Sequence, residues 1–175
     1  MRFISERIRK TYEEIGRYVY SNTLNIDNYK FIAGKYDNID EIKNAPEERW
    51  IDFKTGDLWG EESHGWFKTS VKVPEEFAGQ TIALSFHTFL GDWDNTTNPQ
   101  FILYVNGEHI QGLDVNHQET ILTHNAVAGE VYNIDLHAYI GRIEGKKSTL
   151  HGKLVTIDEE ARKLYFNLSV PHIVA

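Results

Sequence analysis

The segment from Phe101 to Leu122, FILYVNGEHIQGLDVNHQETIL, restricts the fold of this chain more than any other stretch. Five apolar or aromatic residues, 101–105, precede Asn106-Gly107, and a second strand-like arm follows over 108–113. Asn-Gly between two such runs is a strong hairpin signal, because both central residues of a type I′ turn need a positive φ. We therefore predict a β-hairpin at the centre of a β-sandwich, a pattern that identifies no function by itself.

Alternation of apolar and polar residues indicates further strands on both sides of this hairpin. Pro74 ends one of these segments, since proline cannot donate to a strand ladder. Regularly spaced short strands joined by turns are typical of an antiparallel, jelly-roll-like β-sandwich. The fold class we predict is therefore mainly β, with an added amino-terminal helix. The alternating segments are 67–73, 80–87, 132–138 and 150–157.

The amino terminus predicts an amphipathic helix over residues 3–20. Its apolar residues recur every three or four positions and share one face. They are Ile4, Ile8, Tyr12, Ile15 and Val19. Such a helix is typical of an arm that docks against other structure.

Residues 158–169 fit two interpretations. Leu164, Phe166 and Leu168 alternate as in a strand, whereas Ala161, Leu164 and Leu168 fit one face of a helix. Asp158 would cap such a helix, and the two acidic residues after it would lie near its positive end. We favour the helix.

The intervening segment 21–49 is weakly patterned. Its asparagines and aspartate suggest turns, and 29–33 has the character of a short extended piece. We expect this segment to wrap over the sandwich. The predicted division is an arm and wrapping segment over 1–49 and a β-sandwich domain over 50–175.

Charge and composition exclude several functional classes. The formal net charge of −8 at pH 7 argues against nucleic acid and anionic membranes as partners. The chain has no cysteine, so disulfides and thiolate metal sites are excluded. The first twenty residues lack the apolar run of a signal peptide, and no segment is apolar enough to span a bilayer. We expect a cytoplasmic location.

Several short motifs, in order, resemble one family. They are Trp59-Gly60, Trp66-Phe67-Lys68, Val73-Pro74, the run 103–108, the run 111–114 and Asn116-His117. Together they are similar to the amino-terminal β-domain of α-mannosidases of glycoside hydrolase family 38. The resemblance covers about Trp50 to Gly141 and implies a galactose-binding-like sandwich.

The resemblance also implies where the chemistry lies. These α-mannosidases carry their nucleophile and a divalent metal, expected to be zinc, in a following catalytic domain that contains a His-x-Asp motif. No histidine of this chain has aspartate two residues later. We therefore expect no catalytic residue, no metal site and no cofactor here, and a chain that is a fragment of a longer protein. Its expected partner is the catalytic domain of the same chain, and the parent could form a homo-oligomer.

The candidate sugar-binding residues lie in two polar segments. Asp92, Trp93 and Asp94 belong to a loop whose oxygen-rich side chains also suit calcium, with a self-bonded turn as the simpler explanation. Asp114 and His117 form the second cluster, which would orient a loop or face a sugar. The other tryptophans are expected in the core or an interface.

Three functional hypotheses follow. The first is a non-catalytic domain that scaffolds the catalytic domain of an enzyme hydrolysing terminal α-mannosides with retention. The second is an autonomous carbohydrate-binding module, with mannosides as ligands and with exposed aromatics beside polar groups on one concave surface. The third is an interaction domain without sugar contact.

Overall fold

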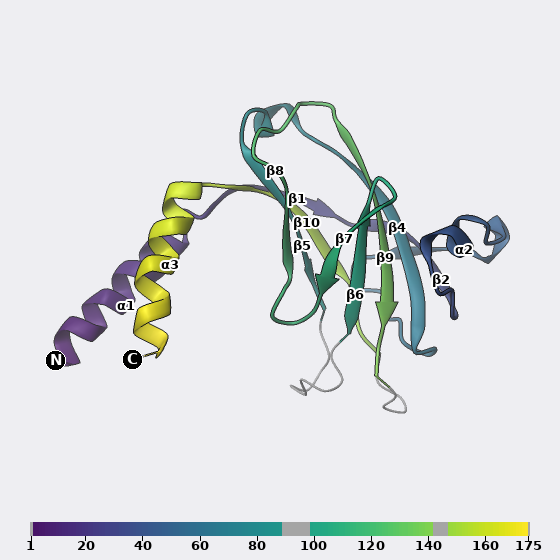
Figure 1. Cartoon of the computed structure of the whole chain (residues 1–175), viewed down its shortest axis with the longest axis horizontal. Coiled ribbons are helices and arrows are strands. Elements are labelled where there is room, and N and C mark those ends of the chain that lie inside the picture. The colour runs from purple at the N-terminus through teal and green to yellow at the C-terminus, as the bar shows by residue number, and fades with distance from the viewer. Residues whose placement is uncertain (1, 89–98, 142–146, 175) are drawn as a thin grey trace.

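The computed structural model describes residues 2–88, 99–141 and 147–174, which form two packed antiparallel sheets and a pair of helices projecting from one end (Figure 1). The smaller sheet has the strand order β1 (Tyr20–Ile26), β10 (His151–Ile157), β5 (Thr81–His87) and β8 (Glu119–Thr123). The larger sheet has the order β3 (Ile51–Lys54), β2 (Asn28–Ala33), β4 (His64–Lys72), β9 (Val131–Tyr139), β6 (Gln100–Val105) and β7 (Glu108–Leu113). The predicted jelly-roll-like β-sandwich is confirmed.

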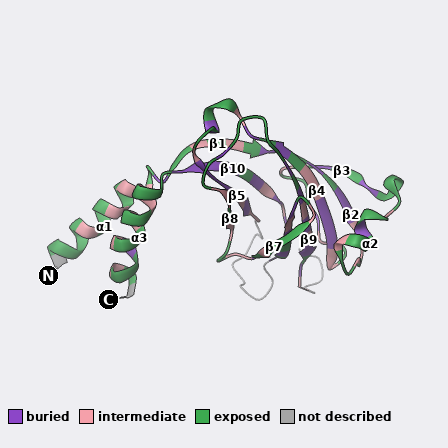
Figure 2. Cartoon of the chain, turned by 45° about the horizontal axis from the view of Figure 1, so that its top comes forward, coloured by how far each residue is buried: buried purple, intermediate pink, exposed green. Residues whose placement is uncertain are grey.

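The core lies between the sheets, because one face of each alternating strand is apolar. Ile134, Leu136 and Ala138 of β9 face it at no more than 1% exposure. Leu84 of β5 and Leu154 of β10 face it from the smaller sheet, both at 0%. Figure 2 shows the buried inner strands and the exposed helices and connections. Trp59 joins this core, whereas Trp50 and Trp66 are buried on the outer face of the larger sheet, as expected for core tryptophans.

The hairpin that the sequence predicts joins β6 to β7. Asn106 has φ of 52° and Gly107 has φ of 84°, as a type I′ turn requires. The Asn106 side chain accepts a hydrogen bond from the backbone N–H of Asn133 at 2.9 Å. The turn is therefore tied to the neighbouring strand β9 as well as closing the hairpin.

Segment 21–49 differs from the wrapping layer that we expected. β1 pairs with β10 in the smaller sheet, and β2 lies between β3 and β4 in the larger one. β1 is an edge strand and so carries many exposed polar residues, which weakened its pattern in the sequence. Helix α2 (Ile39–Lys43) and the 3₁₀ turn η1 (Glu47–Arg49) cover the outer face of the larger sheet, and a second 3₁₀ turn, η2 (Glu75–Phe77), precedes β5. The division of the chain into domains stays a prediction.

Helices α1 (Arg2–Gly16) and α3 (Glu159–Val174) form what we call the helical pair. They lie side by side, with both chain ends at the far tip (Figure 1). The Tyr12 and Tyr165 rings meet edge to face at 6.0 Å, and Gly16 lets the Tyr165 ring approach α1 closely. None of the helices within the described residues is long and apolar enough to cross a membrane.

Both predicted helices are present. α1 is shorter than expected, because the chain turns after Gly16 and Val19 is buried at the root of the sandwich, 6% exposed. α3 begins at Glu159 and includes 159–169, so the helical interpretation is confirmed. The Asp158 carboxylate accepts a hydrogen bond from the N–H of Ala161 at 2.9 Å, which is the cap that the sequence predicts.

Candidate functional site

A cleft separates the outer face of the smaller sheet from the first turns of α3. Its volume is about 560 Å³, and the connection between β7 and β8 closes its third side. Ser85, His87 and Lys153 form part of its floor, because they alternate with the core-facing residues of β5 and β10. The cleft therefore lies where the helical pair meets the sandwich.

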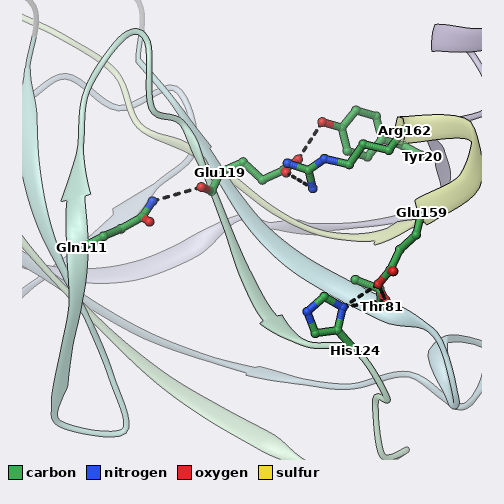
Figure 3. A network of polar contacts seen from close by, with 7 residues as sticks. All are labelled: Tyr20, Thr81, Gln111, Glu119, His124, Glu159 and Arg162. Carbon is green, nitrogen blue, oxygen red and sulfur yellow. Dashed lines mark hydrogen bonds and ion pairs between the residues drawn. The ribbon is translucent and has the colours of Figure 1, made fainter. Parts of the chain in front are cut away.

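One polar contact in the cleft holds α3 to strand β8. Arg162 of α3 forms an ion pair with Glu119 at 2.8 Å, and the Tyr20 hydroxyl donates to the other Glu119 oxygen at 2.6 Å (Figure 3). Burial, together with this hydrogen bond to a carboxylate, raises the pKa of Tyr20 to about 12. Gln111 of β7 donates to the backbone carbonyl of Glu119 at 3.0 Å, so the contact is braced from the larger sheet.

A second contact fixes the first residue of α3. The Glu159 carboxylate accepts hydrogen bonds from the Thr81 hydroxyl and from Nδ1 of His124, each at 2.5 Å (Figure 3). These two donors hold the pKa of Glu159 below its ordinary value of 4.5. We call the two contacts together, Tyr20–Glu119–Arg162 and Thr81–His124–Glu159, the α3 anchor. It sets the direction in which α3 leaves the sandwich.

The predicted cluster Asp114–His117 is a self-contained turn. One Asp114 oxygen accepts from the backbone N–H groups of Asn116 and His117, both at 2.8 Å, and from the His117 ring at 3.0 Å. Burial would raise the pKa of Asp114, but these hydrogen bonds outweigh it and hold the pKa below its ordinary value. Asp114 is therefore an anion near neutral pH. His117 lines the cleft, and Asp114 lines a second cavity.

The other predicted sugar-binding residues, Asp92, Trp93 and Asp94, lie outside the described residues. The same holds for the calcium alternative in that loop. The residues that form the α3 anchor carried no signal in the sequence, since Tyr20, Glu119 and Arg162 are far apart in the chain and belong to no motif. Only the acidic start of α3 hinted that Glu159 has a capping position.

The chemistry that the cleft can support is limited. Burial, followed by the nearby Lys153 and His151, lowers the pKa of His87, which favours a neutral ring. Glu119 is the one carboxylate among the described residues that line the cleft, and both of its oxygens are engaged. Retaining glycosidases need two carboxyl groups about 5 Å apart, so the described cleft lacks that arrangement.

No metal centre is formed by the residues 2–88, 99–141 and 147–174. Nowhere among them do three or more histidine, aspartate or glutamate side chains gather closely enough to hold an ion. The described residues therefore do not fit the divalent metal that the family resemblance implies for the parent enzyme.

The helical pair exposes large apolar side chains. On α1 the exposed fractions are 73% for Phe3 and 63% for Ile4, and on α3 they are 48% for Leu164, 51% for Val170 and 73% for Ile173. We call these five residues the apolar surface of the helical pair. The sandwich also exposes apolar residues, such as Ile51 and Val127, but these five lie on the two helices that project from it.

Comparison with protein families gives one match. The family described as "Alpha-mannosidase, jelly roll domain" covers residues 30–174. No curated protein matches the chain.

Solved structures show the same fold at low identity. The β-glucuronidase from Ruminococcus gnavus has a TM-score of 0.54 at 13% identity, over 81% of this chain and 30% of that one. The complex of that enzyme with D-glucuronic acid has a TM-score of 0.53 at 14% identity, over 80% of this chain and 30% of that one. A β-glucuronidase from an uncultured Clostridium species has a TM-score of 0.50 at 16% identity, over 78% of this chain and 29% of that one. The chain therefore spans about 30% of the length of these enzymes.

Proposed function

Because the chain belongs to the family of α-mannosidase jelly roll domains, we propose that it is a non-catalytic scaffold within a longer glycoside hydrolase. In this proposal its partner is the catalytic domain of the same protein. The parent enzyme hydrolyses terminal α-mannosides with retention, as family 38 enzymes do, in the cytoplasm. The observation that carries the proposal is the apolar surface of the helical pair.

The apolar surface supports a docking role through its exposure and position. Burying a leucine or isoleucine side chain that is now exposed stabilises an interface by roughly 1.5–3 kcal/mol. The helical pair projects away from the sandwich, so another domain can reach these residues without displacing a strand (Figure 1). The sandwich has a buried core of its own between its sheets, whereas the two helices pack mainly on each other.

The α3 anchor supports the same role. A docking element transmits position only if it is held rigidly to its own domain. Glu119 is 16% exposed and Arg162 30% exposed at their side chains, so their ion pair is better shielded from water than an ordinary surface pair. Two contacts join α3 to the sandwich: Glu159 bonds to Thr81 of β5 and to His124 just after β8, and Arg162 pairs with Glu119 of β8. They therefore orient the surface that we propose to dock.

The proposed chemistry belongs to the partner. The divalent metal, which we expect to be zinc, and both carboxylates of the retaining mechanism are placed in the catalytic domain, and an oligomer of the parent is compatible with this. In support, the described cleft offers a single engaged carboxylate.

An association experiment tests the scaffold role. The remainder of the parent enzyme is produced without this chain, and the chain is then added in trans while aryl α-mannoside turnover is measured. We expect the added chain to increase the amount of soluble, active enzyme. The double variant Leu164→Lys/Val170→Lys should lower its apparent affinity for the remainder by at least about tenfold, since two buried apolar side chains become charged.

The control is Ile51→Lys/Val127→Lys. These residues are 57% and 60% exposed on the sandwich and lie on neither helix of the pair, so association should not change. Full activity of the remainder without the added chain would refute the scaffold role. Equal loss in both double variants would refute the assignment of docking to the helical pair.

A further inference from the structure

The outer face of the larger sheet carries a continuous strip of aromatic rings. Trp66 stacks on His137 with ring centroids 4.5 Å apart and planes at 4°, and on Tyr104 at 5.7 Å. The His64 ring lies 5.9 Å from His137 and 5.0 Å from Tyr139. We call Tyr104, Trp66, His137, His64 and Tyr139 the aromatic strip. It crosses β6, β4 and β9 on the side away from the core.

One end of the strip is covered and the other is open. Trp66 is 0% exposed beneath Ile42 of α2 and Trp50, which form a small apolar cluster of their own. Tyr139, at the opposite end, is 40% exposed and borders a cavity of about 450 Å³. Protein sites for small molecules have volumes of roughly 300–1,000 Å³, so the open end is large enough for a ligand.

One residue of the cavity wall, Gly112, has no side chain. Gly112 of β7 lies opposite Ile102 of β6, and Ile102 lies opposite His137 of β9 (Figure 1 shows the three strands). A Cβ atom on Gly112 would approach no closer than 3.9 Å to any neighbour, namely the Phe101 carbonyl oxygen. Nothing in the packing therefore demands glycine there, and any larger side chain would enter the cavity instead.

Polar groups gather around this apolar floor. Nδ1 of His64 and Nε2 of His137 are buried and have no hydrogen-bond partner among the described residues. Both atoms are closed off from solvent, so His64 and His137 line the cavity without offering these two nitrogens to a ligand. Gln100 and the ionised Asp114 also line the cavity, and Asp114 supplies a carboxylate acceptor.

The charged groups around the cavity determine which class of ligand it can bind. Lysine and arginine are absent from the described residues that line the cavity. Burial, followed by the neighbouring His64, lowers the pKa of His137 and keeps its ring neutral. An anion would meet the Asp114 carboxylate with no lysine or arginine among these described lining residues to compensate it, and a purely apolar ligand would desolvate the Asp114 carboxylate and the Gln100 amide.

We propose that this cavity binds one uncharged sugar residue, with its ring face on Tyr139 and its hydroxyls bonded to Asp114 and Gln100. Sugars combine apolar C–H faces with hydroxyl groups that both donate and accept, which matches an aromatic ring beside a carboxylate and an amide. The site differs from the cleft at the α3 anchor, and it is independent of the scaffold role.

Titration of the isotope-labelled chain by NMR tests the proposal. The probe is methyl α-D-mannopyranoside, raised to about 50 mM because single sugar residues bind weakly. We expect saturable shifts in the amide signals around Tyr139, Gln100 and Gly112. Sodium glucuronate at the same concentration should cause shifts at least about tenfold weaker, because its carboxylate faces Asp114.

Two variants separate binding from folding. Gly112→Val fills the cavity at a position where the backbone accepts a side chain, and Tyr139→Ala removes the stacking ring. Each should weaken the mannoside response by at least about tenfold. Tyr18→Ala is the matched control, since Tyr18 is another exposed tyrosine, at 63%, and does not line the cavity.

Several results would overturn the site. The proposal fails if the mannoside causes no saturable shift, or if its shifts centre on residues away from the cavity. It also fails if glucuronate binds as tightly as the mannoside, or if a folded Gly112→Val variant binds the mannoside as well as the wild type does. None of these results tests the proposed docking role of the helical pair. The scaffold role is tested separately, by association in trans.

Discussion

At the scale of single residues, the turn at Asn106-Gly107 shows local chemistry that the tertiary structure also uses. Asn106 tolerates its φ of 52° better than most residues, because its short polar side chain bonds nearby backbone. Here that bond goes to Asn133 of β9, so the same residue closes the hairpin and joins it to the next strand.

Replacing the turn should therefore cost stability. We expect Asn106→Ala/Gly107→Ala to lower the free energy of unfolding by about 1–3 kcal/mol, because alanine resists a positive φ. Denaturant unfolding monitored by tryptophan fluorescence measures this change. Gly112→Ala in the same hairpin is the matched control and should be close to neutral, since a Cβ there meets nothing within 3.9 Å. An unchanged midpoint in the double variant would contradict the strain argument.

At the scale of elements, α3 depends on groups that lie in the sandwich. Its own amphipathic pattern is weak, with apolar residues exposed at 48–73%. Its start is fixed by the Asp158 cap and by the α3 anchor. The direction of the helical pair is therefore set by contacts to strands β5 and β8 and the residues after them.

The anchor should be sensitive to acid. Because the folded pKa of Glu159 lies below 4.5, its contacts stabilise the folded chain above that pH, and the contribution is lost as pH falls through the lowered folded pKa. We expect Glu159→Gln to flatten the loss of stability between about pH 5 and pH 3, measured as the thermal midpoint against pH. The control variant Glu160→Gln, which changes the next residue, should keep the wild-type dependence of the thermal midpoint on pH. Identical slopes for wild type and Glu159→Gln would show that this anchor contact contributes nothing.

At the scale of the whole molecule, the proposed docking element and the proposed sugar site lie on different parts of the described surface. The helical pair projects from one end, whereas the open end of the aromatic strip lies on the outer face of the larger sheet. A scaffold can therefore bury its helices against a neighbour and still present the cavity to solvent.

The isolated chain should not hydrolyse an aryl α-mannoside. Retention requires a nucleophilic carboxylate and an acid about 5 Å apart, and Glu119 in the cleft is already bonded to Tyr20 and Arg162. Turnover should stay at background with or without added zinc, in an assay where the parent enzyme is the positive control. Metal-dependent turnover by the chain alone would place an active site in it after all.

Local pattern predicted many of the elements of this protein, but not β1 or α2. Period-two alternation predicted β4, β5, β9 and β10, Asn-Gly predicted the hairpin, and Asp158 predicted the start of α3, because each signal lies within a few adjacent residues. Tertiary structure decided what those elements bring together. Tyr20 meets Glu119 across 99 positions, and His64 joins His137 through the register of β4 with β9, pairings that no local pattern encodes. The turn of Asp114 was foreseeable because its hydrogen bonds join residues that are close together in the sequence. The cavity beside it is lined by residues of β4, β6, β7 and β9, which only the register of the sheet brings together.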